Sequence, residues 1–93
     1  MTTSASRPPH LPDWLSTAAY KVNQLTRAQL SVLGCLALGM DIKATARALN
    51  RSERTIKMHT TAIMAKFGVD SRLKAGIIGH HLLTVGKLDT PET

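Results

Sequence analysis

Several residue types on which common functional sites depend are scarce in this sequence. Its 93 residues include one cysteine, one tryptophan, one tyrosine and one phenylalanine. A single thiol cannot close an internal disulfide, and Cys35 lies in an apolar run, so we expect a buried thiol and a reducing, cytoplasmic location. Three aromatic side chains are too few to stack a single-stranded nucleic acid. No apolar run reaches the roughly 18 residues of a membrane span and no signal peptide is recognisable, so we expect no membrane partner.

Acidic residues are scarce as well, and basic residues outnumber them. Six Asp and Glu stand against 12 Lys and Arg, which gives a formal net charge of +6 and an isoelectric point near 10.1. In a short chain this balance favours a polyanionic partner, nucleic acid before membrane, although basic charge also serves solubility alone. Carboxylates are sparse and no nucleophile motif or phosphate-binding loop is recognisable, so we predict no catalytic residue and no enzyme.

Metal and cofactor binding are not expected either. His80 and His81 are adjacent, so on a helix their side chains point about 100° apart and do not share a metal ion as a pair four residues apart does. Cys35 is the only thiol in the sequence. We therefore predict no metal site and no cofactor.

Helical periodicity organises the chain into one small domain preceded by an extra helix. Asp13 stands where it would cap that first helix, and Thr26 and Gln29 have the spacing of a capping box for the next one. Further helices are predicted over 42–49, over 53–67 and from about residue 70 to 85. The resulting segments are a flexible N-terminal segment (1–12), an N-terminal helix (13–22), a helical domain (23–86) and a polar tail (87–93).

Residues 52–69 form the stretch around which the rest of the chain is organised. Ser52 is suited to start a helix and Gly68 to end it. Between them, four residues recur at helical spacing and define the inner face of a helix: Ile56, Thr60, Ile63 and Phe67. By itself this pattern also fits a surface helix with a solvated basic face. A shorter helix and a turn of about four residues precede it, however, which is the helix-turn-helix arrangement of DNA-binding proteins.

The most specific motif in the sequence is Thr55-Ile56-Lys57, then His59, followed by Lys66-Phe67-Gly68-Val69 and Arg72. Through these residues, the stretch from Leu25 to Leu82 resembles the LuxR-type (LuxR/FixJ) helix-turn-helix domain of bacterial transcription regulators. The resemblance implies an all-α fold, a four-helix domain of this type with an additional N-terminal helix. It also implies a sequence-specific regulator that binds double-stranded DNA through a recognition helix at 53–66. One departure is Gln29, which stands where the family usually has Glu.

The resemblance lends DNA-binding roles to individual residues. Contacts to base edges are implied for Arg54, Lys57, Met58 and Thr61, because lysine can donate to guanine while methionine and threonine can touch the thymine methyl group. Contacts to phosphates are implied for Lys43, Thr55, His59, Lys66 and Arg72. Simpler interpretations are surface ion pairs for Lys43 and Arg72, support of the helix cap for Thr55, and packing for His59.

The final helix offers a second apolar side. In this family the last helix commonly forms the dimer contact, so the resemblance implies an interface at Leu73, Ile77, His80 and His81. A two-fold dimer would match inverted half-sites about one DNA turn apart. The alternative is that both sides of this helix serve one intramolecular core.

An unusual apolar row lies on the helix that begins at the capping box. Leu30, Gly34 and Leu38 follow each other at steps of four, in positions that the family usually fills with polar side chains. An exposed apolar row needs a cover. The segment from Trp14 to Val22 is the closer candidate, because a short linker tethers it. A partner protein is the other candidate, such as RNA polymerase or another regulator, for which the chain would serve as an adaptor with little direct DNA readout.

Overall fold

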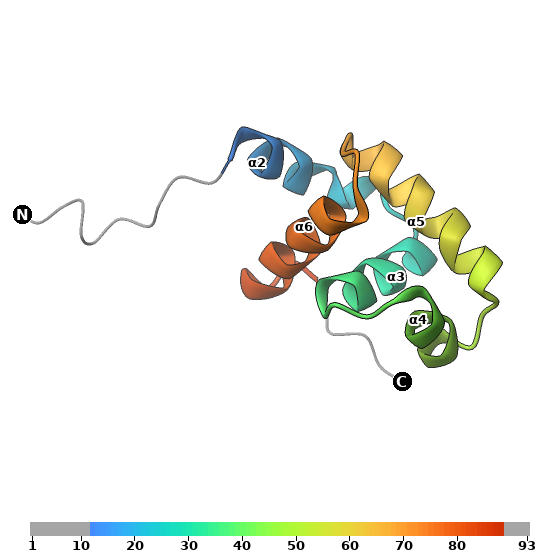
Figure 1. Ribbon diagram of the computed structural model, residues 1–93. Helices are drawn as coiled ribbons and strands as arrows, with labels where there is room; N and C mark the ends of the chain where they lie inside the picture. Colours follow the sequence, from blue (N-terminus) through green and yellow to red (C-terminus); the bar gives the residue numbers. More distant parts are fainter. Residues whose placement is uncertain (1–11, 89–93) are drawn as a thin grey trace, which may run out of the picture.

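The computed structural model describes residues 12–88, which form an all-helical fold (Figure 1). No strand is present in this range. The predicted segment 1–12 lies outside it apart from Pro12, as does the tail beyond residue 88. The elements, in chain order, are α2 (Asp13–Ala19), the 3-10 helix η1 (Tyr20–Gln24), α3 (Arg27–Ala37), α4 (Ile42–Leu49), α5 (Glu53–Phe67) and α6 (Arg72–Thr84).

Helix α3 is the centre of the molecule and packs against α4, α5 and α6. Leu33 on α3, Ile63 on α5 and Ile78 on α6 are fully buried and meet in one core. Helix α6 approaches α3 closely at Gly76 and Gly79, two glycines of α6 that face α3. A Cβ on Gly79 would lie 3.0 Å from the Cβ of Ala37. The close packing of α3 and α6 therefore requires a residue without a side chain at position 79. None of the helices within residues 12–88 is long and apolar enough to cross a membrane.

The helix ends predicted from side-chain capping are confirmed. The backbone N–H of Gln29 donates to Thr26 Oγ1 at 3.1 Å, and the backbone N–H of Thr26 donates to Gln29 Oε1 at 3.0 Å. Ser52 Oγ accepts from the backbone N–H of Thr55 at 3.1 Å, and Gly68 ends α5 in the left-handed conformation at φ 71°. These contacts span at most three residues, which is why the sequence alone reveals them.

The first helix differs from its prediction. Asp13 does not cap it: Pro12 occupies the cap position without a side-chain hydrogen bond, and Asp13 lies in the first turn. A carboxylate there still favours the helix, because it faces the positive end of the helix dipole. The α-helix ends at Ala19 rather than residue 22, and the chain continues as the tighter helix η1 up to Gln24.

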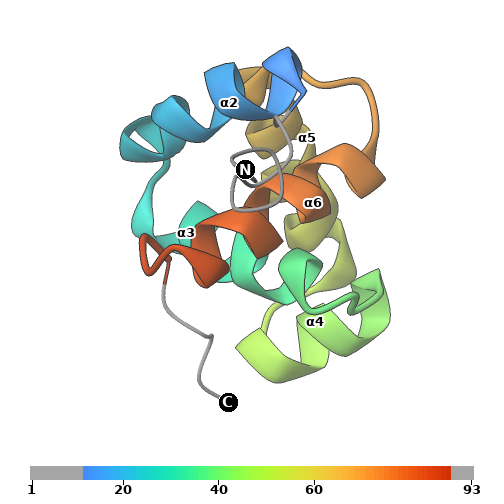
Figure 2. The same ribbon diagram turned by 90° about the vertical axis from the view of Figure 1, so that its left-hand side faces the viewer.

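Helix α2 packs on α6, and this corrects the expectation that it would cover the row on α3. Figure 2 shows α2 over α6, at the opposite end of the molecule from α4. Leu15 and Ala18 are buried there, and Lys74 Nζ lies 5.5 Å from the centre of the Trp14 ring. Helix α6 is apolar on more than one side, and α2 packs against one of these sides. The prediction considered only the apolar row of α3 as the surface that α2 would cover.

The apolar row itself is only partly covered. Leu30 is half-buried and Gly34 is buried, whereas Leu38 at the end of α3 remains 52% exposed. Leu88, from the predicted polar tail, packs partly buried against the core. The row is thus mostly absorbed by the domain, and one leucine of it stays at the surface.

Candidate nucleic-acid interface

Helices α4 and α5 are joined by a turn whose conformation one asparagine sets. Asn50 has φ 55° and ψ 51° and is the one non-glycine residue among 12–88 with a positive φ. Asparagine tolerates this left-handed region better than most residues. The backbone N–H of Arg51 donates to the carbonyl of Ala46 at 2.9 Å, which closes the turn on α4. Ser52 then starts α5 in a new direction, along the outer edge of the molecule (Figure 1).

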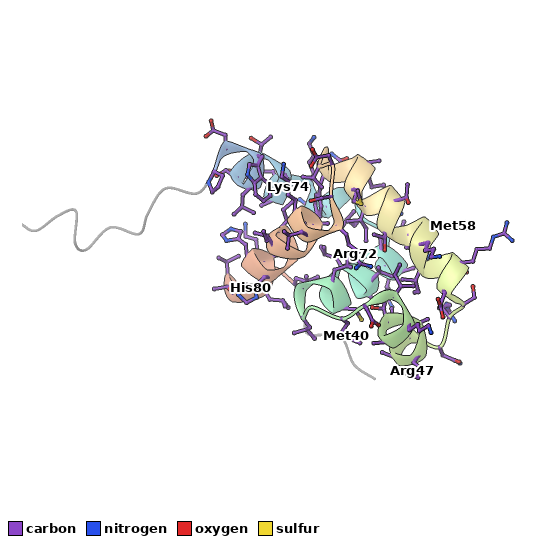
Figure 3. All side chains as sticks on the ribbon, in the orientation of Figure 1. Met40, Arg47, Met58, Arg72, Lys74 and His80 are labelled. Carbon is purple, nitrogen blue, oxygen red and sulfur yellow. The ribbon has the colours of Figure 1, made fainter. Side chains whose placement is uncertain are left out.

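The outward side of α5 carries the residues expected to read bases. Four of them are exposed and line one shallow depression together with Ala62 and Ala65: Arg54, Lys57, Met58 and Thr61. Met58 is 63% exposed and points away from the domain (Figure 3). On the inward side Ile56, Thr60 and Ile63 are buried, as the periodicity predicted. The helix therefore presents two cations beside small or flexible groups, with no bulky aromatic ring.

The residues expected to hold phosphates come from three helices, α4, α5 and α6. Lys43 is exposed in the first turn of α4, and Thr55 and His59 are half-buried on α5. The Thr55 hydroxyl accepts from Ser52 Oγ at 3.0 Å, so it supports the cap. Arg72 lines a groove between α6 and the end of α3. Neither Lys43 nor Arg72 forms an ion pair with a residue of the described range.

Lys66 has a different environment from the one expected of a phosphate contact. Its Nζ donates to the carbonyl of Gln24 and to Gln29 Oε1, both at 2.8 Å. Two of its three N–H groups are thereby engaged inside the protein. Lys66 ties the C-terminal end of α5 to the start of α3, and the acceptor is the same Gln29 that completes the capping box. Sequence reasoning did not foresee this link, because its partners lie 42 and 37 residues away.

Two exposed arginines that the sequence analysis did not single out flank the turn. Arg47 on α4 and Arg51 in the turn line a shallow hollow together with Lys43 and Glu53. Figure 3 shows Arg47 on the outer side of α4. The signal available in the sequence was their charge at helical spacing beside the predicted turn.

The expected dimer residues divide between two depressions on either side of α6. Leu73, Ile77 and His80 are exposed and line a groove with Leu36 and Met40 at the end of α3. Leu73 is 73% exposed and Ile77 41% exposed. His81 is half-buried and faces the other way, into a cleft beside α2 and η1. No group of three or more metal-ligating side chains occurs within residues 12–88.

The single thiol is buried, as expected. Burial raises the pKa of the Cys35 thiol, and the neighbouring Thr45 hydroxyl lowers this pKa by less. Thr45 Oγ1 makes no hydrogen bond of good geometry with the described residues, so we regard its effect on the thiol as weak. A thiol held in its neutral form inside the core is a packing residue.

Comparisons with known proteins agree with this geometry. Residues 23–78 match the family described as "Bacterial regulatory proteins, luxR family". The chain belongs to this family. The prediction of a LuxR-type fold with an added N-terminal helix is thereby confirmed, and membership of a family of regulatory proteins supports the expectation that the chain is not an enzyme.

Curated bacterial proteins are similar to part of the chain as well. The nitrate/nitrite response regulator protein NarL of Escherichia coli is 34% identical over 65 residues, which cover 70% of this chain and 30% of NarL. The nitrate/nitrite response regulator protein NarP of Escherichia coli is 43% identical over 54 residues (58% of this chain, 25% of NarP). The transcriptional regulatory protein YdfI of Bacillus subtilis is 44% identical over 52 residues (56% of this chain, 24% of YdfI). This chain spans less than a third of each relative, and no solved structure matches it significantly.

Proposed function

We propose that this luxR-family chain binds double-stranded DNA through α5 and regulates transcription in a sequence-specific way. The observation that carries the proposal is the outward side of α5, where Arg54, Lys57 and Met58 are exposed after a helix-turn-helix turn. An α-helix fits the major groove of B-DNA, and base edges there distinguish all four base pairs. Its relatives NarL and YdfI are named as a response regulator and a transcriptional regulatory protein.

Four side chains of α5 contact the base edges. Lys57 and Arg54 donate to guanine O6 or N7, and Met58 and Thr61 contact the thymine methyl group. Lys43, Thr55, His59 and Arg72 hold phosphates and fix the register of the helix on the duplex. Lys66 has a structural role in place of a phosphate contact: its hydrogen bonds to Gln24 and Gln29 hold the C-terminal end of α5 against the start of α3.

We further propose that two copies of the chain associate through α6. Helix α2 covers one side of α6 and α3 another, and Leu73 and Ile77 remain exposed beside His80. Large aliphatic side chains clustered at the surface favour association with a complementary apolar surface. A two-fold dimer presents two recognition helices to inverted half-sites about one DNA turn apart. His81 lines the cleft beside α2 and η1 instead, so it is not part of the proposed surface.

A second candidate function is an adaptor that binds another protein, such as RNA polymerase or another regulator. The observation in its favour is the groove of about 450 Å³ between α3 and α6, which Leu36, Met40 and Ile77 line. The exposed Leu38 lies at the same end of α3. This function is compatible with base reading by α5, since the groove and the outward side of α5 are formed by different residues, whereas Arg72 lines the groove and would be shared with the phosphate contacts.

The experiment that tests the proposed function is selection of bound sequences from a random duplex pool. We expect the unchanged protein to enrich a defined motif. Lys57→Ala should weaken binding to that motif by about 1–3 kcal/mol and make one position of it degenerate. The matched control is Lys87→Ala, an exposed lysine beside α2. A Lys57 variant that loses no more than this control, or loses equally on every sequence, would contradict specific reading by α5.

A further inference from the structure

A cleft beside α2 and η1 lies outside the surfaces that the proposed function uses. Its volume is about 620 Å³, within the roughly 300–1,000 Å³ that is typical of small-molecule sites. Residues of α2 and η1 form one side of it, and the end of α6 with the turn beyond forms the other. Of the residues that line it, Asn23 alone falls within the stretch 23–78 that matches the luxR family. The cleft is thus an addition of this chain to the matched region.

Aromatic and aliphatic side chains line the cleft without burying one another. Tyr20, the one tyrosine of the chain, is 81% exposed, and Val85 is 49% exposed. Val22 is half-buried and Leu82 is buried in the same lining. A flat apolar ligand would cover the exposed surface of Tyr20 and Val85, and an aromatic ring would also stack on the phenol ring or meet its edge. The lining therefore favours a ligand with an aromatic body.

The polar groups of the cleft favour an anion. Lys87 brings an ammonium group, Asn23 an amide and His81 an imidazole ring with an N–H donor. None of these three side chains takes part in a hydrogen bond or ion pair between residues 12–88. No Asp or Glu of that range is among the lining residues, so no carboxylate of the described structure competes for the ammonium group. A carboxylate on the ligand would accept a charge-assisted hydrogen bond from Lys87.

The turn after α6 determines where Lys87 lies. Gly86 adopts the left-handed conformation at φ 77°, and the backbone N–H of Lys87 donates to the carbonyl of Leu82 at 2.8 Å. This bond holds the backbone of Lys87 next to the last turn of α6, where its side chain lines the cleft. The anion-binding group is therefore carried by hydrogen-bonded backbone, although its side chain is exposed.

We propose that this cleft binds a small aromatic carboxylate. The aromatic ring packs against Tyr20 and Val85, and the carboxylate accepts hydrogen bonds from Lys87 and His81. The ligand bridges η1 and the end of α6, so its binding stabilises the packing of the N-terminal helix on the domain. The inference does not rest on the proposed function, because the residues that line the cleft are separate from those on the outward side of α5.

The test uses naphthoate as the probe and naphthylmethanol as its uncharged counterpart. Each compound is titrated into the isotope-labelled protein, and the backbone amide signals are followed by NMR spectroscopy. We expect naphthoate to bind with a dissociation constant of about 1 mM or lower. It should shift the signals of residues 19–23 and 81–87. Naphthylmethanol should bind about fivefold more weakly, because it lacks the charge that pairs with Lys87.

Two variants and one matched control locate the site. Lys87→Gln should weaken naphthoate binding about fivefold and leave naphthylmethanol binding unchanged. Tyr20→Ala should weaken the binding of both compounds by roughly two- to tenfold, since both carry the aromatic ring. The control, Lys43→Gln, removes an exposed lysine of α4, at the opposite end of the molecule from α2 (Figure 2), and should bind both compounds as the unchanged protein does. All three replaced side chains are exposed, so the variants should unfold at the temperature of the unchanged protein.

Three results would overturn the inference. Equal affinity for naphthoate and naphthylmethanol would show that no cation of the cleft pairs with the carboxylate. Equal losses in the Lys87 and Lys43 variants, or signal shifts spread over α4 and α5, would show that naphthoate binds basic surface in general. An absence of any signal shift at millimolar naphthoate would show that the cleft holds no aromatic carboxylate. None of these results bears on DNA binding by α5, and a protein that binds naphthoate as expected but no duplex would refute the proposed function alone.

Discussion

Replacement of Gln29 by glutamate should make the domain more stable, and the reason lies in the link between α3 and α5. Gln29 Oε1 accepts from the backbone N–H of Thr26 at 3.0 Å and from Lys66 Nζ at 2.8 Å. Gln29→Glu keeps the shape of this acceptor and adds a negative charge opposite an ammonium group. Hydrogen bonds between two charged groups contribute more than those with one neutral partner.

The expected gain in the free energy of unfolding is about 1 kcal/mol. The new ion pair with Lys66 adds up to about 1 kcal/mol, and a carboxylate in the first turn of α3 adds about 0.3–1 kcal/mol. Desolvation offsets part of this sum, because Gln29 is buried. For a domain of this size, 1 kcal/mol raises the melting temperature by about 4–8 °C.

The pH dependence of the gain gives the sharper measurement. Lys66 and the helix N-terminus should hold the folded-state pKa of the new carboxyl below its value of about 4.3 in the unfolded chain. The gain is then fully present above the unfolded pKa and is lost as the pH falls through the folded-state pKa. Thermal unfolding should be recorded near pH 7 and near pH 3, with Lys66→Met and the double variant beside Gln29→Glu.

Some outcomes would refute this reasoning. A destabilised Gln29→Glu variant would mean that desolvation outweighs the ion pair. A gain that persists at low pH would mean that the carboxylate charge is not its source, and a gain undiminished in the Lys66→Met background would mean that Lys66 contributes nothing to it.

Two further predictions concern α6 and the helix that covers it. Ile77→Asp places a charge on the proposed dimer surface, so it should give a folded monomer by sedimentation that binds a two-half-site duplex more weakly and a single half-site about as well. An unchanged protein that sediments as a monomer both alone and on DNA would refute the dimer. Leu15→Ala should lower the free energy of unfolding by about 2–4 kcal/mol, because the side chain is buried between α2 and the core. Thr17→Ala, exposed on the same helix, is its control, and an equal melting temperature for both variants would contradict the packing of α2 on α6.

Local physics explains why much of this fold and of its candidate site follows from sequence. The spacing of Ile56, Ile63 and Phe67 predicts which side of α5 faces inward, and all three residues are buried. Ser52 and Gly68 predict where α5 begins and ends, because their capping roles depend only on neighbours within three or four residues. The outward position of Lys57 and Met58 follows from the same period.

Tertiary structure alone decided what depends on competition between distant surfaces. The periodicity shows that α3 has an apolar row and that α6 has two apolar sides, but not which of them α2 covers. Burial of Leu15 and Ala18 against α6 settles that choice. In the same way, the sequence places Lys66 near the end of α5, but the position of α3 and η1 decides that its ammonium group reaches Gln24 and Gln29. Hydrogen bonds within a helix turn are determined by adjacent residues, whereas contacts between helices depend on how every apolar surface of the chain is buried at once.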